Sequence, residues 1–170
     1  MQDTNVPPVV LRTMRIIHAA LCLGVVMLTV VLVVMRHTQK VQADVPVMIY
    51  VGIAFAVMNI AAAWVVPASM DREMRKRILR SEGTPVNTDD PQATWAMLYQ
   101  SRLIVRCALL EGAAFFQPIA YLLAGHPTSL VVLGILFLLL VLQFPTAERV
   151  RAWIDRQRDQ LEQERQGAPG

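Results

Sequence analysis

The amino-acid sequence predicts an all-α fold: a polytopic membrane protein with a four-transmembrane-helix bundle and helical cytoplasmic extensions. Two observations carry this prediction. The 170 residues are 55% apolar and only 17% charged, whereas a soluble domain averages roughly 45–50% apolar and about 25% charged residues. The apolar residues also gather in four blocks, near residues 14–35, 46–68, 103–124 and 128–145. This composition excludes a soluble enzyme, a nucleic-acid-binding domain and a disulfide-stapled secreted module.

Each apolar block is long enough to be a membrane span. The blocks contain 18 to 23 residues, and about 20 apolar residues in a helix cross a hydrocarbon core of ~30 Å. A core helix of a soluble protein would carry a polar face over such a length. We therefore expect a single membrane domain, residues 1–170, whose C-terminal part is a cytoplasmic helix over residues 146–166.

The segment after the second block is basic and has two readings. The second block ends near Pro67, whereas the first helix is expected to open at Pro7 and Pro8. After Pro67, methionines at four-residue spacing oppose a basic face. This pattern would suit either a surface helix on an anionic leaflet or a solvated extension of the second span. We expect this face to contact lipid headgroups through Arg72, Arg75, Lys76 and Arg80.

Turn residues separate the two halves of the chain and fix where the third helix starts. Residues 81–90 are rich in Gly, Pro, Asn and Asp, which break helices. Asp90 followed by Pro91 is typical of an N-cap and a first helical position. The third helix should then run from Pro91 to Leu123.

A last helix should follow the fourth block. That block ends at Pro145, and Thr146 can cap a new helix. Its apolar residues only approximate a heptad seam, and the helix is too short to be claimed as a coiled coil. We therefore expect a solvated, charged helix here.

The basic residues orient the chain. Fourteen of the sixteen Lys and Arg residues lie in the N-terminal arm, the second loop with the foot of the third span, and the tail, and only Arg36 and Lys40 lie on the other side. Because short loops rich in Lys and Arg stay cytoplasmic, both termini should be cytoplasmic. The net charge of +3 is then an orientation signal and needs no nucleic acid to explain it.

One acidic residue, Glu111, lies inside the four blocks. An ionised carboxylate in hydrocarbon costs at least ~2.5 kcal/mol, so it must be protonated, paired or hydrated. If Arg15 and Arg106 mark the cytoplasmic interface, His18 and Glu111 both lie within roughly 4–8 Å of it. A contact between His18 and Glu111 is therefore expected.

Further polar groups could join Glu111 in an intramembrane polar or ion site. Pro118, expected to kink the third helix, frees the carbonyl of Ala114, and Gln117 and Asn59 could add their amides. Two interpretations stay open. The group is either a buried polar network that fixes the register of the helices, or a site that handles protons or ions.

Small residues at four-residue spacing occur once in each of the first three spans, where they allow close approach of helix backbones within a chain or between copies. The pairs are Ala20/Gly24, Gly52/Ala56 and Ala108/Gly112. Cys22 and Cys107 lie inside spans without a metal-ligand spacing and are interpreted as small apolar packing residues.

No catalytic motif is present, so we expect no enzyme activity, no cofactor and no metal site. The expected function is that of a non-enzymatic integral membrane protein that self-associates or is a subunit of a larger membrane complex. The alternative is a proton- or cation-linked channel or transporter with Glu111 as the titrating group. The expected partners are the lipid bilayer, anionic lipids in particular, and a second copy or another membrane protein.

The residues Leu110-Glu111-Gly112, with Phe144-Pro145-Thr146 and the Arg-rich segment after them, carry a resemblance. The chain resembles uncharacterised small four-span bacterial inner-membrane proteins, which have an acidic residue in the third span and a Pro-Thr step after the fourth. The resemblance implies an architecture and a location in the bacterial inner (cytoplasmic) membrane. It implies no catalytic activity.

Overall fold

The computed structural model describes residues 8–39, 45–80 and 91–166, and these residues form five α-helices and no strand. The helices are α1 (Pro8–Gln39), α2 (Val47–Arg80), α3 (Pro91–Ala124), α4 (Thr128–Val141) and α5 (Ala147–Gln166). The all-helical prediction is confirmed, and α3 begins at Pro91 as expected.

Within the described residues, three helices are long and apolar enough to cross a membrane. Their candidate spans are Pro8–Thr38, Val47–Met74 and Trp95–Ala124. α4 is apolar but has 14 residues, which rise about 21 Å and fall short of a hydrocarbon core of ~30 Å. Three long apolar helices indicate a membrane protein, so the prediction holds for three of the four apolar blocks.

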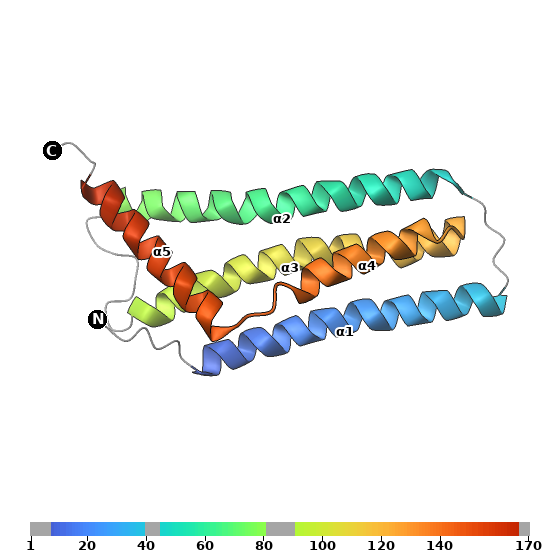
Figure 1. Ribbon diagram of the computed structural model, residues 1–170, viewed down its shortest axis with the longest axis horizontal. Coiled ribbons are helices and arrows are strands. Elements are labelled where there is room, and N and C mark those ends of the chain that lie inside the picture. Colours follow the sequence, from blue (N-terminus) through green and yellow to red (C-terminus); the bar gives the residue numbers. More distant parts are fainter. Residues whose placement is uncertain (1–7, 40–44, 81–90, 167–170) are drawn as a thin grey trace.

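α3 is the centre of the packing. The first four helices alternate in direction, and α4 lies in front of α3, between α1 and α2 (Figure 1). α3 contacts α1, α2 and α4. Small side chains of α3, among them Ala113, Ala114 and Ala120, are fully buried, so neighbouring backbones can approach this helix closely.

The outer faces of α1 and α2 are apolar and exposed. Met27, Val31 and Val34 of α1, and Val57 and Val65 of α2, each expose 49% or more of their surface. A soluble monomer rarely exposes an apolar surface of this extent. These faces therefore suit contact with lipid acyl chains.

The basic segment after the second block is part of α2. This helix continues through Pro67 to Arg80, so the segment is a continuous extension of the second apolar helix and not a separate one. Arg72 and Lys76 are exposed on it. The side chains of Arg75 and Arg80, and the whole of residues 81–90, lie outside the described part of the chain.

α5 begins as predicted but is not the solvated helix that the sequence suggested. The Thr146 hydroxyl accepts a hydrogen bond of 3.3 Å from the backbone N–H of Arg149 and so caps the helix. α5 lies obliquely across one end of α2 and α3 (Figure 1). Val150, Trp153 and Ile154 are buried, because they pack against neighbours that the local sequence does not reveal.

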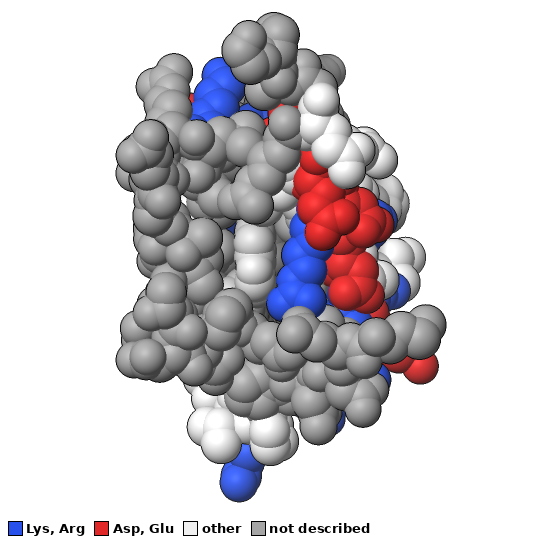
Figure 2. All heavy atoms as spheres, turned by 90° about the vertical axis from the view of Figure 1, so that its left-hand side faces the viewer, with Lys and Arg blue, Asp and Glu red and all other residues white. Residues whose placement is uncertain are grey.

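Aromatic side chains hold α5 on α3. The ring of Trp153 meets the rings of Trp95 and Tyr99 edge-on, with centroids 6.3 and 5.5 Å apart. The outer face of α5 is charged, and acidic side chains gather along one side of this end of the molecule, beside basic ones (Figure 2). The exposed acidic residues of α5 are Glu148, Asp155, Asp159, Glu162 and Glu164.

Docking of α5 can be tested by truncating its buried face. Ile154→Ala should cost roughly 2–5 kcal/mol of the stability of the docked helix, since it leaves a cavity in a packed interface. Trypsin should then cleave the Arg-rich α5 of the lipid-embedded protein faster than in the wild type. Glu162→Ala, on the exposed face, is the control. Equal cleavage rates for the two variants would show that α5 is not docked.

Candidate functional site

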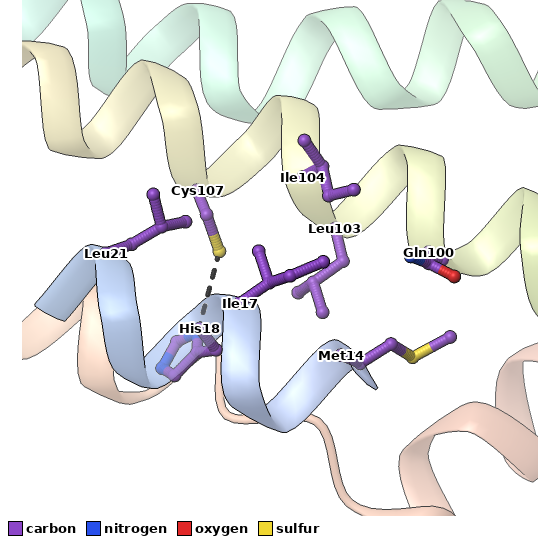
Figure 3. A pocket seen from close by; sticks show the side chains of 8 residues that line it. All are labelled: Met14, Ile17, His18, Leu21, Gln100, Leu103, Ile104 and Cys107. Carbon is purple, nitrogen blue, oxygen red and sulfur yellow. Dashed lines mark hydrogen bonds between the residues drawn. The ribbon is translucent and has the colours of Figure 1, made fainter. Parts of the chain in front are cut away.

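The structure places His18 in a narrow space between α1 and α3 (Figure 3). This ring is 3% exposed. Met14, Leu21 and Leu103 line the space with it, and the cavity left beside them has a volume of about 10 Å³. That volume holds one water molecule at most, so the space around His18 has no room for a substrate.

Both ring nitrogens of His18 face thiols. Nδ1 lies 3.7 Å from Sγ of Cys107, and Nε2 lies 3.7 Å from Sγ of Cys22. A neutral imidazole can donate to one thiol and accept from the other. Because the two nitrogens point to opposite sides of the ring, the two thiols cannot share a metal ion with it. The cysteines thus serve as packing residues that also satisfy a buried histidine.

Glu111 is half-buried between α3 and α1, but it is not paired with His18. Its Oε1 lies 3.6 Å from the position that a Cβ on Gly24 would occupy, so the carboxylate packs over the glycine of α1. Among the described residues, the polar contacts of His18 go to the two thiols, and Glu111 makes no hydrogen bond or ion pair. The expected direct contact between His18 and Glu111 is therefore not formed there.

Gln117 connects α3 to α2, on a different side of α3 from Glu111. Its side chain is 1% exposed, and Nε2 donates a hydrogen bond of 2.9 Å to the carbonyl of Gly52. A Cβ on Gly52 would lie 3.1 Å from Oε1 of Gln117. The glycine therefore lets the amide reach the backbone of α2.

Asn59 and Pro118 are buried without joining a shared chamber. Nδ2 of Asn59 donates to the carbonyl of Phe55, one turn earlier in α2, at 2.9 Å. α3 continues through Pro118, whose side chain is fully buried. The expected polar residues are thus all placed in or beside the helix interfaces, but His18 and Glu111 face α1 while Gln117 faces α2. These residues therefore connect α3 to α1 and, separately, α3 to α2.

Arg36 has a structural role that the sequence analysis did not find. Its Nη1 donates to the carbonyls of Tyr121 and Leu122 at the C-terminal end of α3, and its guanidinium lies over the Tyr121 ring at 5.4 Å. A cation at a helix C-terminus complements the helix dipole. Gly125 ends α3 with a φ of 69°, and a Cβ there would overlap the guanidinium. The sequence signal was a lone Arg after the first span and a Gly after the third.

No group of three metal-ligating side chains occurs among residues 8–39, 45–80 and 91–166. Comparison with known proteins adds no relative: no protein-family model, no curated protein and no solved structure matches the chain. Its function must therefore be argued from its own residues.

The contact between Gln117 and Gly52 predicts opposite effects for two glycine substitutions. Gly52→Ala should lower the free energy of unfolding by about 1–3 kcal/mol, because the added methyl group overpacks the interface. Gly134→Ala adds the same methyl group to α4 where nothing lies within 4 Å, and should leave stability unchanged or raise it by up to about 1 kcal/mol. Unfolding in mixed detergent micelles measures both. Equal changes would remove the role assigned to the Gln117 contact.

Removing the Arg36 side chain that caps α3 should lower the free energy of unfolding. Arg36→Gln loses charge-assisted hydrogen bonds to two carbonyls, and each such bond contributes about 1.5–3 kcal/mol. The midpoint of unfolding should fall accordingly. Thr38→Ala, two residues further along α1 and exposed, is the control. An Arg36→Gln protein as stable as this control would contradict the capping role.

Proposed function

We propose that the protein is a non-enzymatic membrane protein that self-associates, or acts as a subunit of a larger membrane complex, through an open face of α3. The observation that carries this proposal is the exposure of Ala108 and Gly112 on the central helix. Gly112 has nothing within 4 Å of the position of a Cβ, and both residues are exposed. Glu111 lies beside them.

The contrast with the second small-residue pair supports this proposal. Gly52 and Ala56 are buried, and Gln117 of α3 packs on Gly52, so this pair is used inside the chain. Ala108 and Gly112 have the same spacing but receive no helix of the described chain. Small residues at this spacing allow close backbone contact between transmembrane helices, and a helix from a second copy or a partner subunit would fit there.

Glu111, which packs over Gly24 of α1 at the edge of this open face, adds a second argument for a partner. A half-buried carboxylate in an apolar helix is costly unless it is protonated or paired, and Glu111 makes no hydrogen bond within the described part of the chain. A donor on a neighbouring subunit would satisfy it. Hydrogen bonds between transmembrane helices contribute about 0.6–2 kcal/mol.

Our proposal includes four spans with both termini in the cytoplasm of a bacterium. Leu142 and Gln143, which follow α4, line the same cavity as Arg106 of α3. α3 rises about 27 Å from Arg106 to Ala124, so α4 and the turn after it cover nearly the thickness of a hydrocarbon core. The excess of basic residues near α5 favours the cytoplasm for that end, and anionic lipids as partners.

A test of association uses two glycines that are both open. Gly112→Leu should reduce the mass of the particle extracted in native lipid to that of a smaller assembly, because the side chain blocks close approach at α3. Gly134→Leu places the same side chain on α4, where there is also nothing within 4 Å, and should leave the mass unchanged. Native mass spectrometry measures both. A monomeric wild type without a bound partner would refute the proposal.

Glu111 itself favours one alternative, a proton- or cation-linked channel or transporter in which this carboxyl group titrates. Glu111→Gln discriminates between the two functions. If the protein is a structural subunit, wild type and variant both insert and neither conducts. In a transporter, wild-type proteoliposomes show an ion- or pH-driven flux that the variant lacks.

A further inference from the structure

A second polar site lies away from Glu111, at the end of the molecule where α5 crosses α2 and α3. Four arginines from two helices line one cavity of about 380 Å³. Two tryptophans, one from α2 and one from α5, complete its wall. We call it the arginine pocket; the residues used below are Arg102, Arg106, Arg149, Arg156, Trp64 and Trp153.

The pocket carries an excess of positive charge. No acidic residue is among the described residues that line it. One of the four arginines, Arg102, forms an ion pair of 3.4 Å with Asp71. Like charges this close together repel one another unless an anion enters, so the pocket should attract anions.

Arg106 is the unusual member of this group. Its guanidinium carbon lies 3.8 Å from the centroid of the Trp64 ring, so one face of the cation is stacked on the indole. Its Nε and Nη2 are buried and have no hydrogen-bond partner in the described part of the chain. Nε1 of Trp153, another residue of the pocket wall, is also buried and has no hydrogen-bond partner in that part of the chain. Buried donors are nearly always paired, which points to an acceptor supplied from outside the chain.

The other arginines are already held in position. Nη1 of Arg149 donates to the carbonyl of Leu142 at 2.5 Å and to that of Phe144 at 3.4 Å. Nε of Arg156 donates to the carbonyl of Ala152 at 2.9 Å. Because these contacts restrict the side chains before any ligand arrives, less conformational entropy is lost when an anion binds.

The apolar residues at the rim of the pocket indicate which class of anion fits. Trp64 is 60% exposed and Leu142 is 53% exposed, and both belong to apolar helices or their ends, so the cavity opens beside surface that suits acyl chains. A guanidinium recognises phosphate oxygens through paired N–H donors. A molecule with a phosphate and two acyl chains satisfies both parts of the site.

We propose that the arginine pocket binds the phosphate group of an anionic phospholipid, with Arg106 as the central ligand and Arg149 and Arg156 at its side. This site is separate from the exposed basic face of α2 that includes Arg72 and Lys76. It needs the protein to lie in a membrane, but it does not depend on association through α3.

The test measures binding of phosphatidylglycerol to the delipidated full chain in detergent, by native mass spectrometry, with phosphatidylcholine as the zwitterionic comparison. Wild type should retain phosphatidylglycerol preferentially. Arg106→Gln should weaken this binding about tenfold or more, since a charge-assisted hydrogen bond is lost. Arg149→Gln, at an exposed position, should weaken it in the same direction and tests the site even if the first variant fails to fold.

Arg12→Gln is the matched control, because it removes one positive charge from an exposed position on α1 that does not line the pocket. It should change binding by no more than about twofold, as expected for a screened surface charge. Equal losses in the control and the pocket variants, or equal binding of the two lipids, would overturn the proposal. A second arm adds inorganic phosphate without lipid: binding of phosphate with no preference for phosphatidylglycerol would assign the pocket to a free anion and also overturn it.

Discussion

The close packing of α3 against its neighbours is the constraint on which the rest of the structure depends. A helix that contacts all four others must present small side chains where backbones approach, and Ala113, Ala114 and Ala120 do so. Its polar side chains must then find partners across the interfaces, because hydrocarbon offers none. Gln117 reaches the carbonyl of Gly52, and the thiol of Cys107 lies against His18. These contacts fix the positions of α2 and α1 along the central helix.

The ends of the helices follow the same physical rule. Arg36 of α1 satisfies carbonyls at the end of α3, and Arg149 of α5 satisfies the carbonyls of Leu142 and Phe144 after α4. Cations at helix C-terminal ends therefore connect successive parts of the chain. Within the described residues, the carboxylate of Glu111 and two guanidinium nitrogens of Arg106 are among the polar groups that have no such partner. They are the basis of the two proposed interactions, one with a neighbouring helix and one with a lipid phosphate.

Much of the fold was predictable because it depends on local signals. The apolar blocks predict where α1, α2 and α3 lie, Pro91 predicts the start of α3, and Thr146 predicts the cap of α5. The basic extension of α2 could not be assigned from its pattern, since a surface helix and a straight continuation have the same periodicity. The docking of α5 was missed because Trp153 finds Trp95 and Tyr99 more than 50 residues earlier. Of the candidate site, the sequence identified the polar residues but not their partners.

The sequence alone determined that the chain is apolar enough for a membrane, which residues are polar within its spans, and how its basic residues divide. These properties follow from composition and spacing along one chain. Only the tertiary structure decided that His18 faces thiols while Glu111 packs over Gly24, that Ala108 and Gly112 stay open, and that arginines of α3 and α5 share one pocket. Such pairings depend on how each helix is rotated about its axis, and an all-apolar helix carries too little amphipathic pattern to specify that rotation.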